Sequence, residues 1–197
     1  MIGWHPEYAK GYQNRLRRGG VKIFLDGSPQ GRTAWMSEPY LGADSQYCGY
    51  PVYTDDQVDA FIDEAMGHHW QLLTHCNGDA AAEQLIRCTH RQQARHPEAA
   101  SLRPVMIHAQ LVRRDQLPRM KALNMTASFF TAHCWYWGDI HLRNFGQLRG
   151  GNISPMRWAI DEGLNVTMHQ DTPVIMPNML ESVECACRRV TKGGQAL

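Results

Sequence analysis

The chain has 197 residues, of which 43% are hydrophobic and 20% are charged, and its formal net charge is +1. This length can form one domain with a substantial core, and the composition is typical of a soluble globular protein. The near-neutral charge gives no reason to expect binding to nucleic acid or to an anionic membrane. No apolar run approaches the roughly 20 residues of a membrane-spanning helix. We therefore expect neither nucleic acid nor a membrane as a partner.

The cysteines and the first residues indicate a compartment. The six cysteines include no CxxC pair and do not have the spacing of a small disulfide-rich domain. Residues 1–10 contain no apolar segment like that of a secretory signal. We therefore expect reduced thiols and a cytoplasmic protein.

Strand patterns alternate with helix patterns along the chain. The first predicted strand starts at Val21 and ends in a Gly-Ser turn at residues 27–28, and the others occupy residues 70–74, 104–107, 125–130 and 164–168. Helices are predicted over residues 54–67, 79–95, 113–123, 154–163 and 178–190. This alternation is typical of βαβ units, so it predicts an α/β fold with a parallel sheet and a single domain over residues 1–197.

Short sequence motifs predict where some of the helices begin. Thr54 and Gln57 have the spacing of a capping box, and Ser154 followed by Pro155 has the pattern of a helix start. Residues 28–53 form a connection that is long for a compact domain. Connections of this length are usually lids, binding loops or disordered segments.

Lys22 lies among apolar residues of the first predicted strand. Burying an ammonium group in a dry interior costs on the order of several kcal/mol, so such a lysine needs a partner, a shifted pKa or a chemical modification. Two interpretations follow: an edge strand whose lysine faces water, or a lysine held at the mouth of a site.

Polar side chains follow the other strands at the points where they end. His75, His108, His133 and Asp171 each follow a different predicted strand. Each has a structural interpretation by itself, as a capping or hydrogen-bonded core histidine or as an Asx-turn aspartate. In a (β/α) barrel, however, the carboxyl ends of the strands form the active-site rim. Two imidazoles and a carboxylate converging there suit zinc or a similar divalent ion.

Four motifs occur in order along the chain: VKIFLDGS with GRTA (residues 21–28 and 31–34), HCNGD (75–79), HAQ (108–110) and DTPV (171–174). Together they resemble the amidohydrolase superfamily, in particular amidohydrolase family 3, the YtcJ-like or N-substituted formamide deformylase-like group. The resemblance extends from Val21 to Leu197. It implies a TIM-type (β/α) barrel of the metal-dependent hydrolase class and hydrolysis of a non-peptide C–N bond, of amide or formamide type, by a metal-activated water.

The resemblance also implies roles for individual residues. Lys22 matches the lysine of the fourth barrel strand, which is carboxylated and bridges two metals in binuclear members. His75 and His108 match the metal-binding histidines after strands five and six. Asp171 matches the aspartate after strand eight, which contacts a metal and takes the proton of the attacking water. The implied cofactor is one or two divalent ions, with zinc as the expected metal, and the implied partner is a small amide-type substrate.

The aromatic stretch 131–139 and the residues after it match the loop after strand seven of this family. His133, Trp137, Asp139 and His141 are therefore candidates for substrate contact, with the aromatic rings as an apolar wall and the others as polar groups. An aromatic cluster packed beneath the loop explains the same residues equally well.

The sequence also departs from the family pattern. It contains no His-x-His pair, which holds one of the metals on the first strand of the family, and the matching pattern begins at strand four. We therefore expect a partial barrel, made of strands four to eight. A catalytically inactive fragment or pseudoenzyme is the alternative to a hydrolase. A partial barrel exposes sheet edges, so a homo-oligomer is a further expectation, and a chain acting by itself is expected to carry Lys22 unmodified.

Overall fold

The computed structural model describes residues 6–9, 11–44 and 46–197. Its centre is one five-stranded sheet in the order β1-β2-β3-β4-β5, in which each strand pairs in parallel with the next. The strands are β1 (Val21–Phe24), β2 (Leu72–Cys76), β3 (Val105–His108), β4 (Thr126–Phe129) and β5 (Asn165–Met168). The predicted α/β fold with a parallel sheet is confirmed.

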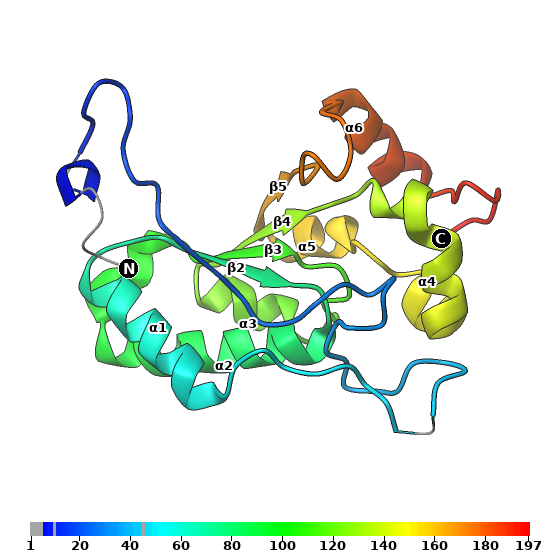
Figure 1. Cartoon of the computed structure of the whole chain (residues 1–197), viewed down its shortest axis with the longest axis horizontal. Coiled ribbons are helices and arrows are strands. Elements are labelled where there is room, and N and C mark those ends of the chain that lie inside the picture. The colour runs from blue at the N-terminus through cyan, green and yellow to red at the C-terminus, as the bar shows by residue number, and fades with distance from the viewer. Residues whose placement is uncertain (1–5, 10, 45) are drawn as a thin grey trace.

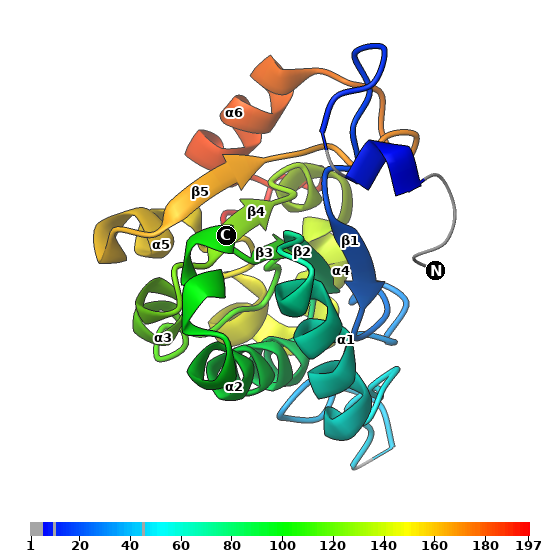
Figure 2. The ribbon, with the colours of Figure 1, turned by 90° about the vertical axis from the view of Figure 1, so that its left-hand side faces the viewer.

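The helices form two groups around this sheet. One group covers one face of the sheet and consists of α1 (Asp55–Gly67), α2 (Asp79–Arg95), α3 (Leu117–Ala122) and α5 (Met156–Glu162) (Figure 2). The other lies beyond the carboxyl ends of the strands and consists of α4 (His133–Gly150) and α6 (Met179–Arg188) (Figure 1). Two short 3-10 helices complete the described elements, η1 (Pro6–Ala9) and η2 (Pro97–Leu102). Within the described residues, no helix is long and apolar enough to cross a membrane.

Strand alternation separates the main core from the opposite face of the sheet. Ile23, Leu72, Met106 and Ala127 are buried in one cluster with apolar residues of the covering helices. Their chain neighbours Lys22, Leu73, Val105 and Thr126 line a hollow instead. Because successive side chains of a strand point to opposite faces, the hollow lies on the face away from α1 and α2. Among the described residues β1 and β5 have one neighbour each, so both edges of the sheet are open.

The start of α1 agrees with the sequence signal. The Thr54 side chain accepts a hydrogen bond from the Gln57 backbone amide, and Gln57 Oε1 accepts one from the Thr54 amide at 3.0 Å. Both halves of the predicted capping box are therefore present. They satisfy two of the amide groups that a helix leaves unpaired at its amino end.

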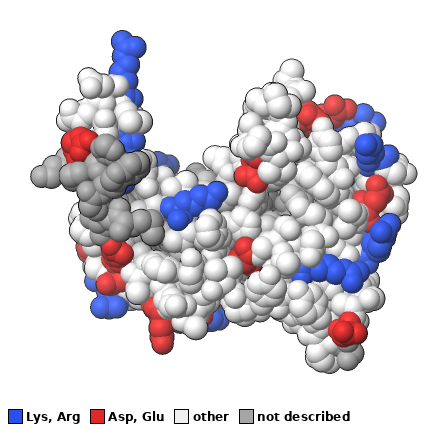
Figure 3. Space-filling view, viewed as in Figure 1, with Lys and Arg blue, Asp and Glu red and all other residues white. Residues whose placement is uncertain are grey.

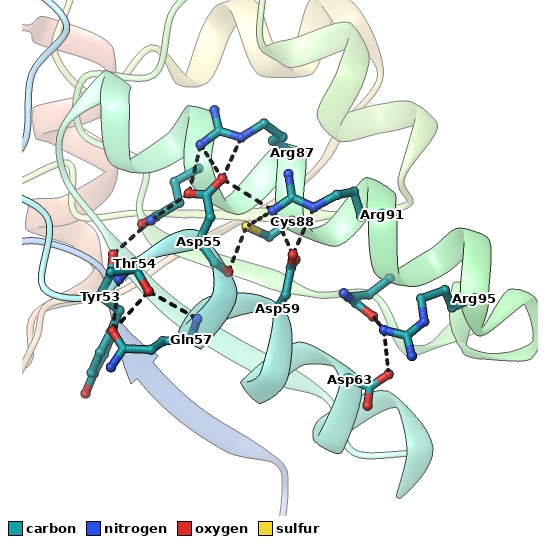
Figure 4. A network of polar contacts seen from close by, with 12 residues as sticks. Tyr53, Thr54, Asp55, Gln57, Asp59, Asp63, Arg87, Cys88, Arg91 and Arg95 are labelled. Atoms are coloured by element: carbon teal, nitrogen blue, oxygen red, sulfur yellow. Dashed lines mark hydrogen bonds and ion pairs between the residues drawn. The ribbon is translucent and has the colours of Figure 1, made fainter.

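A ladder of ion pairs joins α1 to α2. Three aspartates spaced four residues apart on α1 face three equally spaced arginines on α2: Asp55–Arg87 at 2.8 Å, Asp59–Arg91 at 2.8 Å and Asp63–Arg95 at 3.5 Å. Figure 4 shows these side chains pointing toward one another between the helices. The residue numbers rise together along both helices, which shows that α1 and α2 run parallel, as successive βα units require.

Two helix starts differ from the prediction. The helix expected over residues 113–123 begins only at Leu117, because Pro118 has no amide hydrogen and fits only the first turn. The helix expected to be capped by Ser154 begins at Met156 and has no side-chain cap. The Ser154 hydroxyl accepts a hydrogen bond from Gln110 at 3.0 Å instead.

The aromatic stretch expected as a loop after β4 is instead helical from His133 onward, as the first turns of α4. Its buried residues include Cys134, Gly138, His141 and Phe145, spaced three or four apart. That spacing places them on one face of a helix, and the sequence interpretation of an aromatic loop missed it.

The long connection 28–53 is ordered over its described residues. Its Ala34, Met36 and Tyr40 form a second core with Phe145 of α4 and further apolar residues. Asn144 of α4 fastens it by donating to the Pro29 carbonyl at 3.0 Å. The connection is therefore packed onto α4 over much of its length, rather than standing free of the domain.

Candidate metal centre

A hollow of about 560 Å³ lies on the uncovered face of the sheet. All five strands or the residues flanking them contribute to its lining: Lys22, Gln71, Leu73, Arg103, Val105, Ile107, Thr126, Ser128, Thr167, His169 and Asp171. Figure 3 shows the molecule hollowed between the segment that precedes β1 and the α6 side. The lining combines apolar side chains with titratable ones, and His169 and Asp171 lie at the carboxyl ends of the strands.

His108, His169 and Asp171 come together at the carboxyl ends of β3 and β5. Their candidate ligand atoms all lie within 4.8 Å of one another. His169 Nε2 is 3.1 Å from His108 Nδ1, and the two rings are tilted with centroids 5.0 Å apart. Among the described residues, these three side chains form the group that could hold a metal ion.

The backbone at the strand ends directs these side chains. Regular alternation would place His108 on the helix-covered face, with Met106. His108 and Ala109 have φ of +73° and +47°, so the strand geometry ends there and the imidazole turns toward His169. Asp171 also has a positive φ, of +52°. Such left-handed conformations are costly for residues other than glycine and are concentrated at functional sites.

Burial keeps both histidines of the group neutral. Burial, together with the nearby His75, His169 and Lys22 side chains, lowers the pKa of His108 to about 2. Burial likewise lowers the pKa of His169 to about 4, while the Asp171 carboxylate opposes that shift. At neutral pH each imidazole therefore has a lone pair available for a cation.

His75 lies beside this group. Its ring packs edge-on against His108, with centroids 4.6 Å apart. His75 Nδ1 is 3.2 Å from the buried Asp26 carboxylate, and Nε2 is 3.2 Å from the Asn77 side-chain nitrogen. Of the residues predicted as ligands, His75 is thus in ring contact with His108, and His108 in turn lies close to Asp171.

Lys22 lies on the edge strand β1 and is exposed to solvent at the lining of the hollow. Its charge acts on both His108 and His169, lowering the pKa of each. The structure therefore combines the two interpretations of this residue: Lys22 faces water, and it does so on the wall of the candidate site.

His133, Trp137 and His141 form a separate aromatic cluster at the start of α4. His133 Nδ1 is 3.0 Å from His141 Nε2, and the His133 and Trp137 rings are 4.6 Å apart. Phe130 connects this cluster to the metal-ligating group, because its ring contacts both His133 and His169. Both histidines of the cluster are buried.

The Asp139 side chain binds the carboxyl-terminal segment, not the site histidines. Its carboxylate accepts hydrogen bonds from the Thr191 hydroxyl at 2.6 Å, the Gly193 amide at 2.9 Å and the Gln195 side chain at 2.9 Å. The structure does not bring it together with the site histidines, and its predicted substrate contact gains no support from these partners.

A family model described as the amidohydrolase family matches residues 5–196. The chain belongs to the amidohydrolase family. The resemblance read from the four motifs is thereby confirmed over nearly the whole chain.

Individual relatives agree with this family assignment. Bacillus subtilis (strain 168) YtcJ, a protein named as an amidohydrolase, is 25% identical over 174 residues, which are 87% of this chain and 31% of YtcJ. An uncharacterized metal-dependent hydrolase from Pyrococcus horikoshii OT3 superposes with a TM-score of 0.78 at 26% identity, covering 93% of this chain and 36% of that one. A similar hydrolase from Pyrococcus furiosus gives a TM-score of 0.71 at 26% identity, covering 89% and 35%.

These structures confirm a barrel-type fold of the metal-dependent hydrolase class. The chain spans about a third of the length of the relatives it matches. The five strands described here are thus one part of the fold that those amidohydrolases contain.

The side chains present fit the divalent metal that the amidohydrolase fold implies. A tetrahedral zinc site with Zn–N bonds of about 2.0–2.1 Å places its nitrogen ligands about 3.3 Å apart. The 3.1 Å between His108 and His169 is close to that spacing. Two neutral imidazoles and a carboxylate also match the donor set that zinc prefers.

His169 is the member of this group that the sequence interpretation missed. It follows β5 directly and lies two residues before Asp171, so both residues stand at the carboxyl end of the same strand. A histidine two residues from a predicted ligand at a strand end is the signal that could have identified it. Its Nδ1 contacts the Ser128 hydroxyl at 2.9 Å, which orients the ring so that Nε2 faces His108.

Proposed function

We propose that this chain carries the metal-binding part of a hydrolase, with a divalent ion held by His108, His169 and Asp171. The observation that supports the proposal most directly is the convergence of these three side chains within 4.8 Å at one end of the hollow. The relatives that are metal-dependent hydrolases support the same class of reaction. We keep His75 and Lys22 as further candidate ligands, since both lie at the same rim.

A divalent ion bound there lowers the pKa of a water molecule and polarises a substrate carbonyl. Asp171 is the candidate general base: its carboxylate takes a proton from the attacking water and passes it to the leaving amine. The two imidazoles lack the acidic imidazolium proton at pH 7, so their lone pairs suit them to act as ligands.

For the substrate we propose a small compound with a non-peptide C–N bond, of amide or formamide type. The apolar side chains of the hollow, among them Leu73, Val105 and Ile107, suit an uncharged body, and His169 and Asp171 line the same hollow. His133 and Trp137 are candidates for contact with the substrate. Their rings contact each other, and the Phe130 ring lies between His133 and His169 and contacts both.

Metal content and hydrolysis test this proposal together. Inductively coupled plasma mass spectrometry of the purified chain should find close to one zinc or similar ion per chain, and turnover of a panel of N-substituted formamides and amides should follow metal content. Asp171→Asn should lower kcat by at least about 100-fold, as loss of a general base does. Asp161→Asn, on the exposed face of α5, is the matched control and should leave kcat unchanged.

An inactive fragment is the second candidate, and the open sheet supports it. β1 and β5 each lack a second neighbour among the described residues, and the sequence has no His-x-His pair. Stoichiometric metal with turnover rejects this candidate, whereas bound metal without turnover of any tested amide favours it. Association of chains through the open edges remains a prediction, which sedimentation velocity over a range of concentrations tests.

A further inference from the structure

Asp26 is a buried carboxylate directly behind His75. It follows β1, and its side chain has no exposed surface. Its oxygens accept hydrogen bonds from three backbone amides: Trp35 at 3.1 Å, Asn77 at 3.0 Å and Gly78 at 2.7 Å. These three donors fix the position of the carboxylate, so Asp26 presents acceptor oxygens to its other neighbours.

His75 Nδ1 faces that carboxylate. It lies 3.2 Å from Asp26 Oδ1 and is a buried ring nitrogen that makes no hydrogen bond among the described residues. The Asp26 carboxylate is therefore the polar group that faces Nδ1 at close range, without the geometry of a formed hydrogen bond. A carboxylate oxygen can only accept, so the favourable arrangement places the imidazole proton on Nδ1.

Asn77 selects the same tautomer from the other side of the ring. Its side-chain nitrogen is 2.9 Å from the Gly27 carbonyl, which can only accept, so the amide orientation is fixed with the NH2 group on this side. The same nitrogen is 3.2 Å from His75 Nε2. Nε2 of His75 therefore accepts a hydrogen bond from the Asn77 NH2 group. A proton on Nε2 would instead point at that donor.

We propose that Asp26 is a positioning residue of the metal centre, which holds His75 as the Nδ1–H tautomer and keeps the Nε2 lone pair available for a cation. This inference rests on the proposed function, since the lone pair matters only if the rim binds metal. Ligand histidines commonly donate their second ring N–H to a carboxylate, which fixes the ring and raises its basicity. In this chain Asn77 would occupy the lone pair until the metal replaces it.

The competing explanation is that Asp26 only anchors backbone. The three amides it binds belong to the connection before α1 and to the turn before α2, so loss of the carboxylate also disturbs local structure. Asp79 provides the matched control. It is a buried aspartate at the start of α2 that accepts from the Ser37 amide at 2.9 Å and pairs with Arg113 at 2.7 Å, and these partners do not include a histidine.

The tautomer is measured by long-range 1H–15N correlation on metal-free, 15N-histidine-labelled protein at mildly alkaline pH, with the His75 signals identified by their loss in His75→Gln. We expect His75 to be the Nδ1–H form in the wild-type chain and to lose that form in Asp26→Asn, whose amide NH2 would face Nδ1. By isothermal titration with Zn²⁺ or Co²⁺, Asp26→Asn should bind about 10- to 100-fold more weakly, and Asp79→Asn within about twofold of wild type.

An Nε2–H form of His75 in the wild-type chain overturns the inference, and this result does not depend on whether Asp26→Asn folds. Unchanged metal affinity in a folded Asp26→Asn chain also overturns it. If the wild-type chain binds no metal, the proposed function fails. The tautomer result then still decides whether Asp26 orients His75.

Discussion

His133 and His141 are buried histidines paired with each other rather than with a carboxylate. Burial lowers the pKa of His141 to about 3 and holds that of His133 well below its usual range. A free imidazole has a pKa of about 6.5, so between that value and the folded one the unfolded chain binds more protons. The free energy of unfolding therefore falls as the pH decreases through this window.

We expect His141→Gln to reduce this pH dependence. Each such group contributes a slope of up to about 1.4 kcal/mol per pH unit, so between pH 6.5 and pH 5 the variant should lose about 2 kcal/mol less than wild type. Urea unfolding at a series of pH values measures the difference. His90→Gln, at an exposed position of α2, should keep the wild-type slope. A His141→Gln slope equal to that of wild type would contradict the assignment.

Individual residues show where sequence reasoning was sufficient. His75, His108 and Asp171 could be assigned to the rim because parallel strands bring their carboxyl ends to one edge. The same rule could not show that His108 leaves the strand at φ +73° and meets His169, since that depends on a single left-handed residue. Asp139 follows the aromatic residues 135–137, but its hydrogen-bond partners Thr191 and Gln195 are more than 50 residues away and could not be read from local sequence; its contact with substrate stays a prediction.

At the scale of elements, the ladder between α1 and α2 should contribute measurably to stability. Arg91 bonds Asp59 and also lies 3.3 Å from Asp55, so it connects two steps of the ladder. All three side chains are partly exposed, which limits the contribution of each pair through solvent screening.

We predict that Arg91→Ala lowers the free energy of unfolding by about 0.5–1 kcal/mol at low salt and by less at high salt. Arg157→Ala removes an exposed pair on α5 and should cost less than Arg91→Ala, because solvent screens that pair more strongly. Denaturant unfolding at two salt concentrations gives both values. Equal effects of the two substitutions would show that the ladder does not act as a network.

The sequence predicted which helices and strands exist more accurately than the residues at which they begin. The capping box located the start of α1, because its two hydrogen bonds are local. The start of α3 and the helical form of residues 133–139 were missed. Pro118 was read as a tolerated interruption, and the tertiary contacts of α4 with the connection 28–53 do not appear in local patterns.

For the whole molecule, the central claim is that five parallel strands build one wall of a metal site in an amidohydrolase. The sheet order and the family match establish the fold, and the residues at its rim supply the donor set. The sequence predicted a parallel sheet and a barrel-like rim. His169 was missed although it stands two residues before Asp171; the orientation of its ring could not be predicted, because it depends on the pairing of β5 with β4 and on the Ser128 hydroxyl.

The most direct test is a Zn²⁺ titration of the 197-residue chain by calorimetry, comparing wild type with His169→Ala and with the exposed control His90→Ala. We predict about one tightly bound ion per wild-type chain, at least about tenfold weaker binding in His169→Ala and unchanged binding in His90→Ala. Wild-type affinity in His169→Ala, or no binding by the wild-type chain, would contradict the proposed centre.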